Sequence, residues 1–182
     1  MTWDLAVLEA IDSHRTGWMT SIARGLMDAG QPAATYLAAF LLAIAFAAVF
    51  GAWRAVAATM LATVAATAAA EFGKEFIGRP RPPADLALVP TDGLAMPSSI
   101  GALTAGAAVP LILYGLRRAD VVGRLVVVVL VAGTVLVGAA MVYLGAHWVS
   151  DVLAGWALGG LLGVLAFRLL HAVPARTARV TG

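Results

Sequence analysis

The 182-residue chain contains no cysteine and few charged residues, and each shortage excludes a class of protein. Without cysteine there is no disulfide framework, no thiolate metal site and no cysteine nucleophile. Only 12% of the residues are charged and 62% are hydrophobic, a balance that excludes both an ordinary water-facing surface and a disordered chain. A net charge of +2 is too small for a nucleic-acid binder. The composition therefore predicts a protein whose solvent is largely lipid.

Long uncharged runs predict an all-α, integral membrane helical bundle. A helix that crosses the hydrocarbon core needs roughly 20 mostly apolar residues. The first thirty residues mix charges into an apolar pattern, which predicts an N-terminal amphipathic helix or a sixth span. We expect one membrane domain over residues 1–182, with this helix over 1–30, a transmembrane core over 32–170 and a cytoplasmic tail over 171–182. The five clear transmembrane helices are predicted over residues 32–50, 55–70, 98–116, 125–146 and 152–170.

The distribution of basic residues predicts the orientation in the membrane. Basic residues collect on the cytoplasmic side of membrane proteins. With alternating spans, six basic residues fall on one side and three on the other, where acidic residues share their loop. We therefore expect a multi-pass protein of the plasma (inner) membrane, with a cytoplasmic C-terminus and a polar site that faces outside. The six are Arg54, Arg117, Arg118, Arg124, Arg176 and Arg179, and the three are Lys74, Arg79 and Arg81.

Three glycines in the last predicted span recur every four residues, at Gly155, Gly159 and Gly163. Small residues at this spacing let two helix backbones approach closely in lipid. The pattern predicts tight packing of the last span against a neighbour, with no chemistry of its own.

Three short polar segments, residues 74–82, 96–101 and 147–151, fall on the predicted outer side. Polar groups at membrane spans are rare, and they mark candidate functional sites. In the first segment, Lys74, Arg79 and Arg81 supply charge-assisted donors that suit phosphate oxygens. This segment predicts an anion site.

The other two segments complete the predicted site. Ser98 and Ser99 follow a proline where a helix begins, and hydroxyls with free backbone N–H groups there form a phosphate cradle. His147 and Asp151 are four residues apart, so the carboxylate can hold one imidazole nitrogen and leave the other free to attack. Each segment also has a purely structural interpretation: Lys74 paired with a neighbouring glutamate, Ser98 as a helix cap, and the histidine and aspartate as an interfacial pair.

The order and spacing of these segments resemble the type 2 phosphatidate phosphatase superfamily, the membrane lipid phosphate phosphatases related to vanadium haloperoxidases. The first family signature, Lys, six residues, Arg-Pro, is matched by Lys74, Arg81 and Pro82. The second, Pro-Ser-Gly-His, reads Pro97-Ser98-Ser99-Ile100 in this chain. The third, Ser-Arg, five residues, His, three residues, Asp, reads Ala140-Met141, five residues, His147, three residues, Asp151.

The resemblance implies a phosphatase without a metal or other cofactor. In such enzymes the histidine of the third signature attacks phosphorus, forming a phosphohistidine that water hydrolyses. Carried over, His147 would be the nucleophile and Asp151 its orienting partner. Lys74 and Arg81 would bind phosphate, with help from the second-signature residues Ser98 and Ser99, and Arg79 would take the place of a lost arginine.

Two departures from the family pattern bear on activity. Ile100 stands where the family has the histidine that protonates the leaving oxygen, and Met141 where it has a phosphate-binding arginine. Loss of general-acid help costs about two to four powers of ten in rate. A diphosphate substrate would need this help least, because its phosphate leaving group departs with little protonation. These two substitutions thus favour a diphosphatase, for example one that acts on a polyprenyl carrier.

Three functions follow from these observations. The first is a membrane phosphatase or diphosphatase that cleaves a lipid-linked phosphate at the outer face. The second is a catalytically impaired relative that binds or carries a lipid phosphate or supports a partner enzyme. The third is a structural membrane subunit, which leaves the polar segments unexplained. The expected partners are the lipid phosphate or diphosphate and the membrane itself, without nucleic acid, and the sequence leaves open a homo-oligomer and the number of spans.

Overall fold

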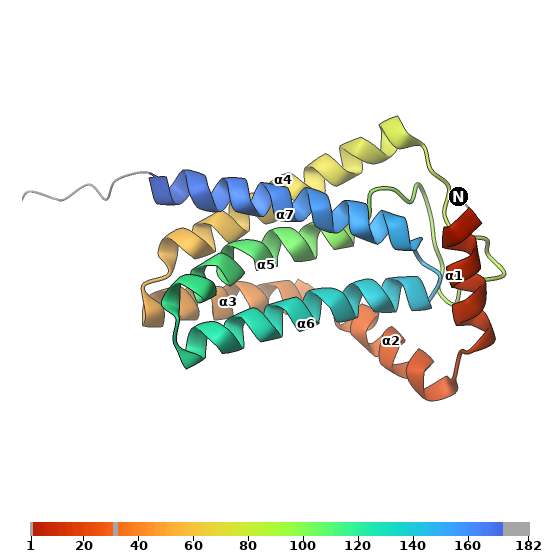
Figure 1. The fold of residues 1–182 in the computed structure, drawn as a ribbon, viewed down its shortest axis with the longest axis horizontal. Helices are drawn as coiled ribbons and strands as arrows, with labels where there is room; N and C mark the ends of the chain where they lie inside the picture. Colours follow the sequence, from red (N-terminus) through yellow and green to blue (C-terminus); the bar gives the residue numbers. More distant parts are fainter. Residues whose placement is uncertain (1, 31–32, 173–182) are drawn as a thin grey trace, which may run out of the picture.

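Seven helices make up the computed structural model of the protein, which describes residues 2–30 and 33–172 (Figure 1). Within these residues there is no strand, and a single β-bridge joins Pro80 to Leu94. The predicted all-α fold class is confirmed. The helices are α1 (Thr2–Ser13), α2 (Gly17–Ala29), α3 (Ala33–Phe50), α4 (Trp53–Ile77), α5 (Ser99–Arg118), α6 (Val121–Tyr143) and α7 (Val149–Ala172).

Four of these helices, α4 to α7, are long and apolar enough to cross a membrane. The predicted span over 32–50 corresponds to α3, which reaches the length of a span when it is taken together with α2 as one bent segment. The N-terminal region, expected as one helix, forms the two short helices α1 and α2. Of the predicted tail, residues 173–182 lie outside the described part of the chain, as do Arg176 and Arg179.

Helix α4 extends beyond the uncharged run from which it was predicted. The loop expected from Glu71 onward begins instead at Gly78, which ends the helix in the left-handed conformation (φ 63°). The charged last turns of α4 continue the backbone hydrogen bonding of the apolar part, so charge ends the membrane run but not the helix. Lys74 therefore lies on a helix, whereas Arg79 and Arg81 lie in the loop.

Helices α5 and α7 pack closely against each other, as the glycine pattern predicts. A Cβ atom at Gly155 would overlap the carbonyl oxygen of Ser98, and one at Gly159 would overlap that of Ala102. At Gly163 it would lie 2.9 Å from the Cβ of Val109. Backbones can approach this closely only where no side chain intervenes. This contact sets the distance between the start of α5 and the start of α7, where two of the three polar segments lie.

The loop over residues 78–98 and the α6–α7 turn meet at the end of the bundle where α1 lies (Figure 1). The backbone N–H of Leu88 donates to the carbonyl of Leu144, and the indole of Trp148 donates to the carbonyl of Pro80. Arg15, between α1 and α2, donates to the carbonyls of Leu86 and Tyr143. These bonds fix the arginine-bearing loop against the turn that carries the histidine.

Candidate active site

His147 lies in the tight turn between α6 and α7 and is only 4% exposed. The turn needs a glycine at position 145, because Gly145 has φ 69° and a Cβ there would overlap the carbonyl oxygen of Leu86. The helix α7 begins at Val149, so His147 precedes it rather than sharing its face with Asp151 as a helical residue. The imidazole nevertheless reaches the aspartate, because the turn directs its ring toward the first turn of α7.

The surroundings of the imidazole determine which nitrogen carries the proton. Nη1 of Arg81 lies 2.7 Å from Nε2 of His147, and a guanidinium donates but does not accept. Nε2 therefore carries the lone pair. The proton belongs on Nδ1, which lies 3.4 Å from Oδ2 of Asp151. This tautomer presents the free electron pair of a nucleophile toward the basic loop.

The Asp151 carboxylate is completely buried and held from several sides. Its Oδ2 accepts the backbone N–H of Trp148 at 3.0 Å as well as facing the imidazole. Its Oδ1 accepts from Nη1 of Arg79 at 2.6 Å. A carboxylate with this many donors is fixed in position, so it can orient the imidazole and stabilise positive charge that forms on it.

The Arg81 guanidinium combines fixed and unused donors. Its Nη1 donates to the carbonyl of Ala146 at 2.8 Å and to the imidazole of His147. Its Nε is buried and has no hydrogen-bond partner among the described residues. A buried donor without a partner costs free energy, and an anion that accepts from Nε would remove that cost. Arg81 is thus suited to receive an anion next to Nε2 of His147.

Burial lowers the pKa of the His147 imidazole below its ordinary value of 6.5, and the hydrogen bond to Asp151 only partly offsets this. The positive charges of Arg81 and Lys74 act in the same direction as burial, whereas the charge of Asp151 opposes them. A lowered pKa keeps the imidazole neutral near pH 7. The ring is therefore in the protonation state that a nucleophile requires.

Lys74 and Ser99 are joined through a carboxylate that was expected only as a neighbour of Lys74. Glu71 accepts from Nζ of Lys74 at 3.0 and 3.1 Å and from the hydroxyl of Ser99. Lys74 nevertheless contributes to the electrostatic potential at His147. The predicted ion pair of Lys74 with a glutamate is therefore present, and the charge of Lys74 still acts on the histidine.

Ser98 caps α5 and faces the histidine at the same time. Its hydroxyl accepts the backbone N–H of Gly101 at 3.2 Å and lies 3.4 Å from Nε2 of His147. Its own backbone N–H donates to the carbonyl of Asp151 at 3.0 Å. Both interpretations of Ser98, the helix cap and the site residue, are compatible with this position.

Arg79 is bound by two carboxylates and makes no hydrogen bond to the imidazole of His147. Nη1 donates to Oδ1 of Asp151 and to the hydroxyl of Ser150, and Nη2 donates to Oδ2 of Asp4 at 2.7 Å. Its guanidinium carbon lies 5.2 Å from the ring centre of Trp148. With these donors in use, Arg79 is engaged in an internal network instead of standing ready for a phosphate.

The two altered positions of the signatures have different surroundings. Ile100 is 38% exposed and lies in the first turn of α5. Met141 is 1% exposed and packs with Leu8 and Val152, and its sulfur accepts from the hydroxyl of Ser98 at 3.7 Å. The position of the absent arginine is thus part of an apolar cluster, in which α1 supplies Leu8.

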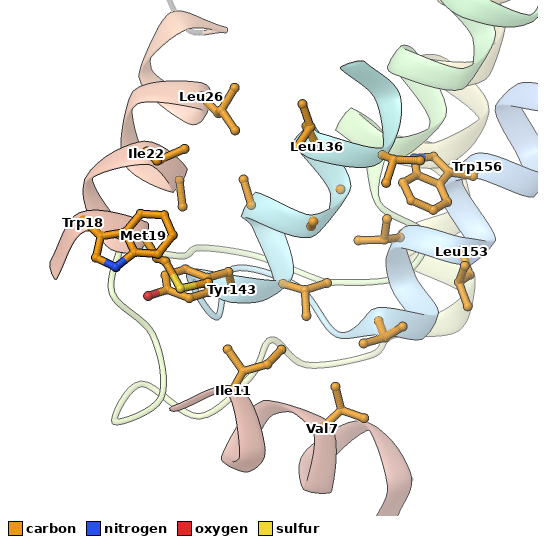
Figure 2. Close-up of a pocket in the computed structure, with 18 residues that line it drawn as sticks. Val7, Ile11, Trp18, Met19, Ile22, Leu26, Leu136, Tyr143, Leu153 and Trp156 are labelled. Atoms are coloured by element: carbon orange, nitrogen blue, oxygen red, sulfur yellow. The ribbon is translucent and has the colours of Figure 1, made fainter. Parts of the chain in front are cut away.

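A groove of about 510 Å³ lies between α1, α2, α6 and α7 (Figure 2). Its lining is apolar and aromatic and includes Val7, Trp18, Leu136, Leu153 and Trp156. The site residues do not line it: the carboxylate of Asp151 is turned to Arg79 and His147, and the α7 glycines face α5. Along the chain, however, two residues of its wall, Val149 and Val152, flank Asp151. The groove therefore reaches the end of α7 that bears the site.

The site residues predicted from sequence fall into two groups in space. His147, Asp151, Arg81 and Ser98 converge, with Lys74 close enough to act on the imidazole. Ser99 and Arg79 are each bound to a carboxylate. The sequence argument missed Asp4, a fully buried carboxylate, because nothing in a single acidic residue of an amphipathic helix links it to positions 79 and 150.

Comparisons with known proteins identify the family and the fold. The PAP2 superfamily profile matches residues 51–174. Among solved structures, the first transmembrane PAP2 type phosphatidylglycerolphosphate phosphatase from Bacillus subtilis is similar over 96% of this chain and 88% of its own, with 25% identity and a TM-score of 0.79. The LpxE structure from Aquifex aeolicus is similar over 90% and 94%, with 19% identity and a TM-score of 0.66. No curated protein sequence matches significantly.

Proposed function

The chain belongs to the PAP2 superfamily, as its motifs predicted, and from that premise we propose that it is a membrane phosphatase that hydrolyses a lipid-linked phosphate or diphosphate through a phosphohistidine at His147. One observation carries the proposal. The lone pair on Nε2 of His147 meets a guanidinium with an unused buried donor, while Nδ1 faces a fixed carboxylate. Nucleophile, anion donor and orienting group are thus within reach of one another, as covalent catalysis requires.

In the proposed first step, Nε2 of His147 attacks phosphorus, and the bond from phosphorus to the leaving oxygen breaks. Arg81 exchanges its bond to Nε2 for bonds to phosphate oxygens, which its Nε can join. Lys74 adds positive charge and Asp151 stabilises the imidazolium that forms. In the second step, water attacks the phosphohistidine, inorganic phosphate leaves, and the electron pair returns to Nε2. Apart from the substrate and water, every group in these two steps is a side chain of this protein.

We infer the leaving group from the isoleucine at position 100. Ile100 carries no proton to donate, and the described residues around Nε2 of His147 are cations and a serine hydroxyl. An alkoxide leaves poorly without protonation, whereas a phosphate leaves with little help. We therefore favour a diphosphate substrate, such as a polyprenyl diphosphate, over a lipid monophosphate.

The apolar groove supports a lipid as the carrier of the phosphate (Figure 2). Its volume is within the range of roughly 300–1,000 Å³ that is typical of ligand sites, and its wall is almost free of polar groups. A hydrocarbon chain of the substrate would fill it from the end where α7 begins. The PAP2-type relative from Bacillus subtilis is named as a phosphatase of a lipid phosphate, which agrees with this assignment.

We also propose that the site faces outside. Arg54, Arg117, Arg118 and Arg124 lie at or near helix ends opposite to the α6–α7 turn, since α4 and α6 begin and α5 ends there. Basic residues favour the cytoplasmic side, so the histidine end would face away from the cytoplasm and the C-terminal end of α7 toward it.

Phosphate release from lipid monophosphates and diphosphates, measured with purified protein in detergent, tests the proposal. The native protein should release phosphate from diphosphates faster, and His147→Ala should abolish release. His171→Ala is the matched control, because this histidine lies near the other end of α7, stacked on Phe167, and should leave the rate unchanged. Faster release from monophosphates would overturn the assignment of the diphosphate.

A second candidate function rests on the same two substitutions. Ile100 and Met141 remove the acid and one phosphate donor of the family pattern, so a protein that binds or carries a lipid phosphate without turnover is the alternative. In the same experiment, binding of the lipid without release by the native protein would favour this alternative.

A further inference from the structure

Asp4, near the start of α1, is a fully buried carboxylate that lies in none of the three signature segments. It accepts three kinds of donor. The backbone N–H of Ser150 donates to Oδ1 at 3.1 Å, while the hydroxyl of Ser150 and Nη2 of Arg79 donate to Oδ2. Burial alone would raise the pKa of Asp4, but these hydrogen bonds hold it below its ordinary value. Asp4 is therefore a buried negative charge attached to the segment that begins α7.

Arg79 connects Asp4 to the candidate active site. Its two terminal nitrogens lie 2.7 Å from Asp4 and 2.6 Å from Asp151. Oδ2 of Asp151 in turn faces Nδ1 of His147. The groups form one continuous chain, from a carboxylate on α1 through a loop arginine to the orienting carboxylate and the imidazole.

The charges along this chain show what Asp4 does. A guanidinium beside Asp151 stabilises its carboxylate but also opposes positive charge on the nearby imidazole. Asp4, on the other side of Arg79, offsets that effect with its negative charge. Without it, Arg79 would act on Asp151 and His147 uncompensated, and the amide and hydroxyl of Ser150 would lose their acceptor.

A second contact places α1 over the same part of the site. Leu8 is one helical turn after Asp4, is also fully buried, and packs on Met141. One face of α1 thus presents a carboxylate to Arg79 and an apolar side chain to the position where the family has an arginine. The helix thus lies against both ends of the third signature, at residues 141 and 150.

We propose that Asp4 is a positioning residue of the reaction: through Arg79 it fixes Asp151 and offsets the arginine charge, so that Asp151 can support the imidazolium of His147. This inference rests on the proposed phosphohistidine chemistry. Asp4 touches neither the substrate nor the reacting nitrogen, and its effect passes entirely through Arg79 and Ser150.

The test compares Asp4→Asn, which removes the charge but keeps the shape, with Asp120→Asn. Asp120 is the matched control because it also pairs with an arginine, Arg118, but at the opposite end of the bundle, where an asparagine still caps α6. Phosphate release from a polyprenyl diphosphate is measured against substrate concentration and pH. For Asp4→Asn we expect kcat to fall about tenfold to a hundredfold, by analogy with the outer hydrogen-bond partners of metal-binding histidines, with KM unchanged.

The pH profile distinguishes a positioning role of Asp4 from a role in folding alone. The charged groups that act directly on His147 are Asp151, Arg81 and Lys74, and Arg79 lies behind Asp151; all four are intact in Asp4→Asn. The uncompensated charge of Arg79 should therefore move the acidic limb of the profile to lower pH, and Asp4→Glu should return it toward the native position. A loss of rate that matches the loss of folded protein, with an unmoved limb, would reduce Asp4 to a structural residue and overturn the inference. So would native values of kcat and of the limb in Asp4→Asn.

A measurement that does not depend on catalysis tests this inference separately from the proposed function. The ring of His147 can be titrated by NMR in detergent with labelled histidine, and His14→Gln and His171→Gln leave it as the single signal. A lower titration midpoint in Asp4→Asn than in the native protein supports the positioning role even if no lipid releases phosphate. An identical midpoint overturns it, whatever the native protein hydrolyses.

Discussion

Arg79 and Arg81 lie two residues apart in one loop, and their surroundings are opposite. Arg79 is bound by Asp4, Asp151 and Ser150, so its charge is matched within the protein. Arg81 contacts a carbonyl and an imidazole, neither of which is charged, and its Nε is buried without a partner among the described residues. The difference teaches that unused donors, rather than the number of positive charges, distinguish an anion site from a structural ion pair.

The comparison defines two regions. The carboxylate network consists of Asp4, Arg79, Ser150 and Asp151, and the open cluster consists of Lys74, Arg81, Ser98 and His147. Asp151 and His147 join the two regions at a distance of 3.4 Å. We expect loss of the cation of the network, Arg79, to lower mainly stability, and substitutions in the open cluster to lower mainly activity.

The largest expected effect comes from Arg79→Ala, which leaves two buried carboxylates facing each other without a cation. Removal of one partner of a buried ion pair costs about 3–5 kcal/mol of stability. Thermal unfolding in detergent should show this as a strongly lowered midpoint. A midpoint close to the native one would contradict the difference between the two arginines, because Arg79 would then contribute no more to stability than Arg81 does.

Arg81→Ala should act on the reaction instead. Loss of a donor that follows the charge of the transition state costs about 10²–10³ in kcat, by analogy with oxyanion-site donors. The unfolding midpoint should change little, because the substitution removes a buried donor that lacks a partner. Phosphate release and thermal unfolding, measured on the same preparation, check both halves of this prediction. A variant that is fully active would exclude Arg81 as a phosphate donor.

Gly155→Ala should disturb the open cluster by pushing Ser98 away from α7. The added Cβ meets the carbonyl oxygen of Ser98, and an overpacked contact costs about 1–3 kcal/mol. Gly133→Ala on α6 is the matched control, because a Cβ there meets nothing within 4 Å and an alanine in a helix is roughly 0.5–1 kcal/mol more favourable than glycine. Unfolding midpoints that change equally in the two variants would contradict the close approach of α5 and α7.

Ile100→His should show how far protonation of the leaving group limits the rate. A restored proton donor should raise release from lipid monophosphates by about tenfold, less than the usual hundredfold or more of general-acid catalysis, because Met141 is still in place. Diphosphates should respond less, since their leaving group needs little protonation. Initial rates on both substrates give the ratio. An unchanged ratio would mean that leaving-group protonation does not limit the rate.

The smallest effect concerns pH. Because burial and the neighbouring cations lower the pKa of His147, kcat/KM should fall only when the pH drops below about 6.5, where the imidazole takes up a proton. Removal of the Arg81 charge in Arg81→Gln takes away one cause of the lowering and should move this limb to higher pH. A limb at higher pH in the native protein than in Arg81→Gln would contradict the sign of this argument.

Apolar runs and glycine spacing predicted most of the fold, because both report on single helices or on one helix pair. The glycines of α7 do meet the backbone of α5, as their period of four indicated. The end of α4 was placed too early, since Glu71 and Lys74 end the uncharged run while the helix continues to Ile77. Charge marks where a helix leaves the hydrocarbon, and only Gly78 marks where it stops.

The site was predictable where a motif fixes residue type and spacing together. His147, Asp151 and Arg81 were found this way, and the structure brings them together. Asp4 and the contact of Leu8 with Met141 were beyond the sequence argument. They depend on where a short helix docks after folding, and neither composition nor periodicity encodes a partner 75 or more positions away.

The glycine contact also restricts how an inhibitor could be accommodated. Because Gly155 brings α7 against the carbonyl of Ser98, and the amide of Ser98 donates to the carbonyl of Asp151, these two helix starts behave as one rigid body. Space for a bulky headgroup mimic has to come from a different rotamer of Arg81, whose side chain rests on the imidazole. A bulky headgroup mimic should therefore bind only when the guanidinium of Arg81 leaves the imidazole.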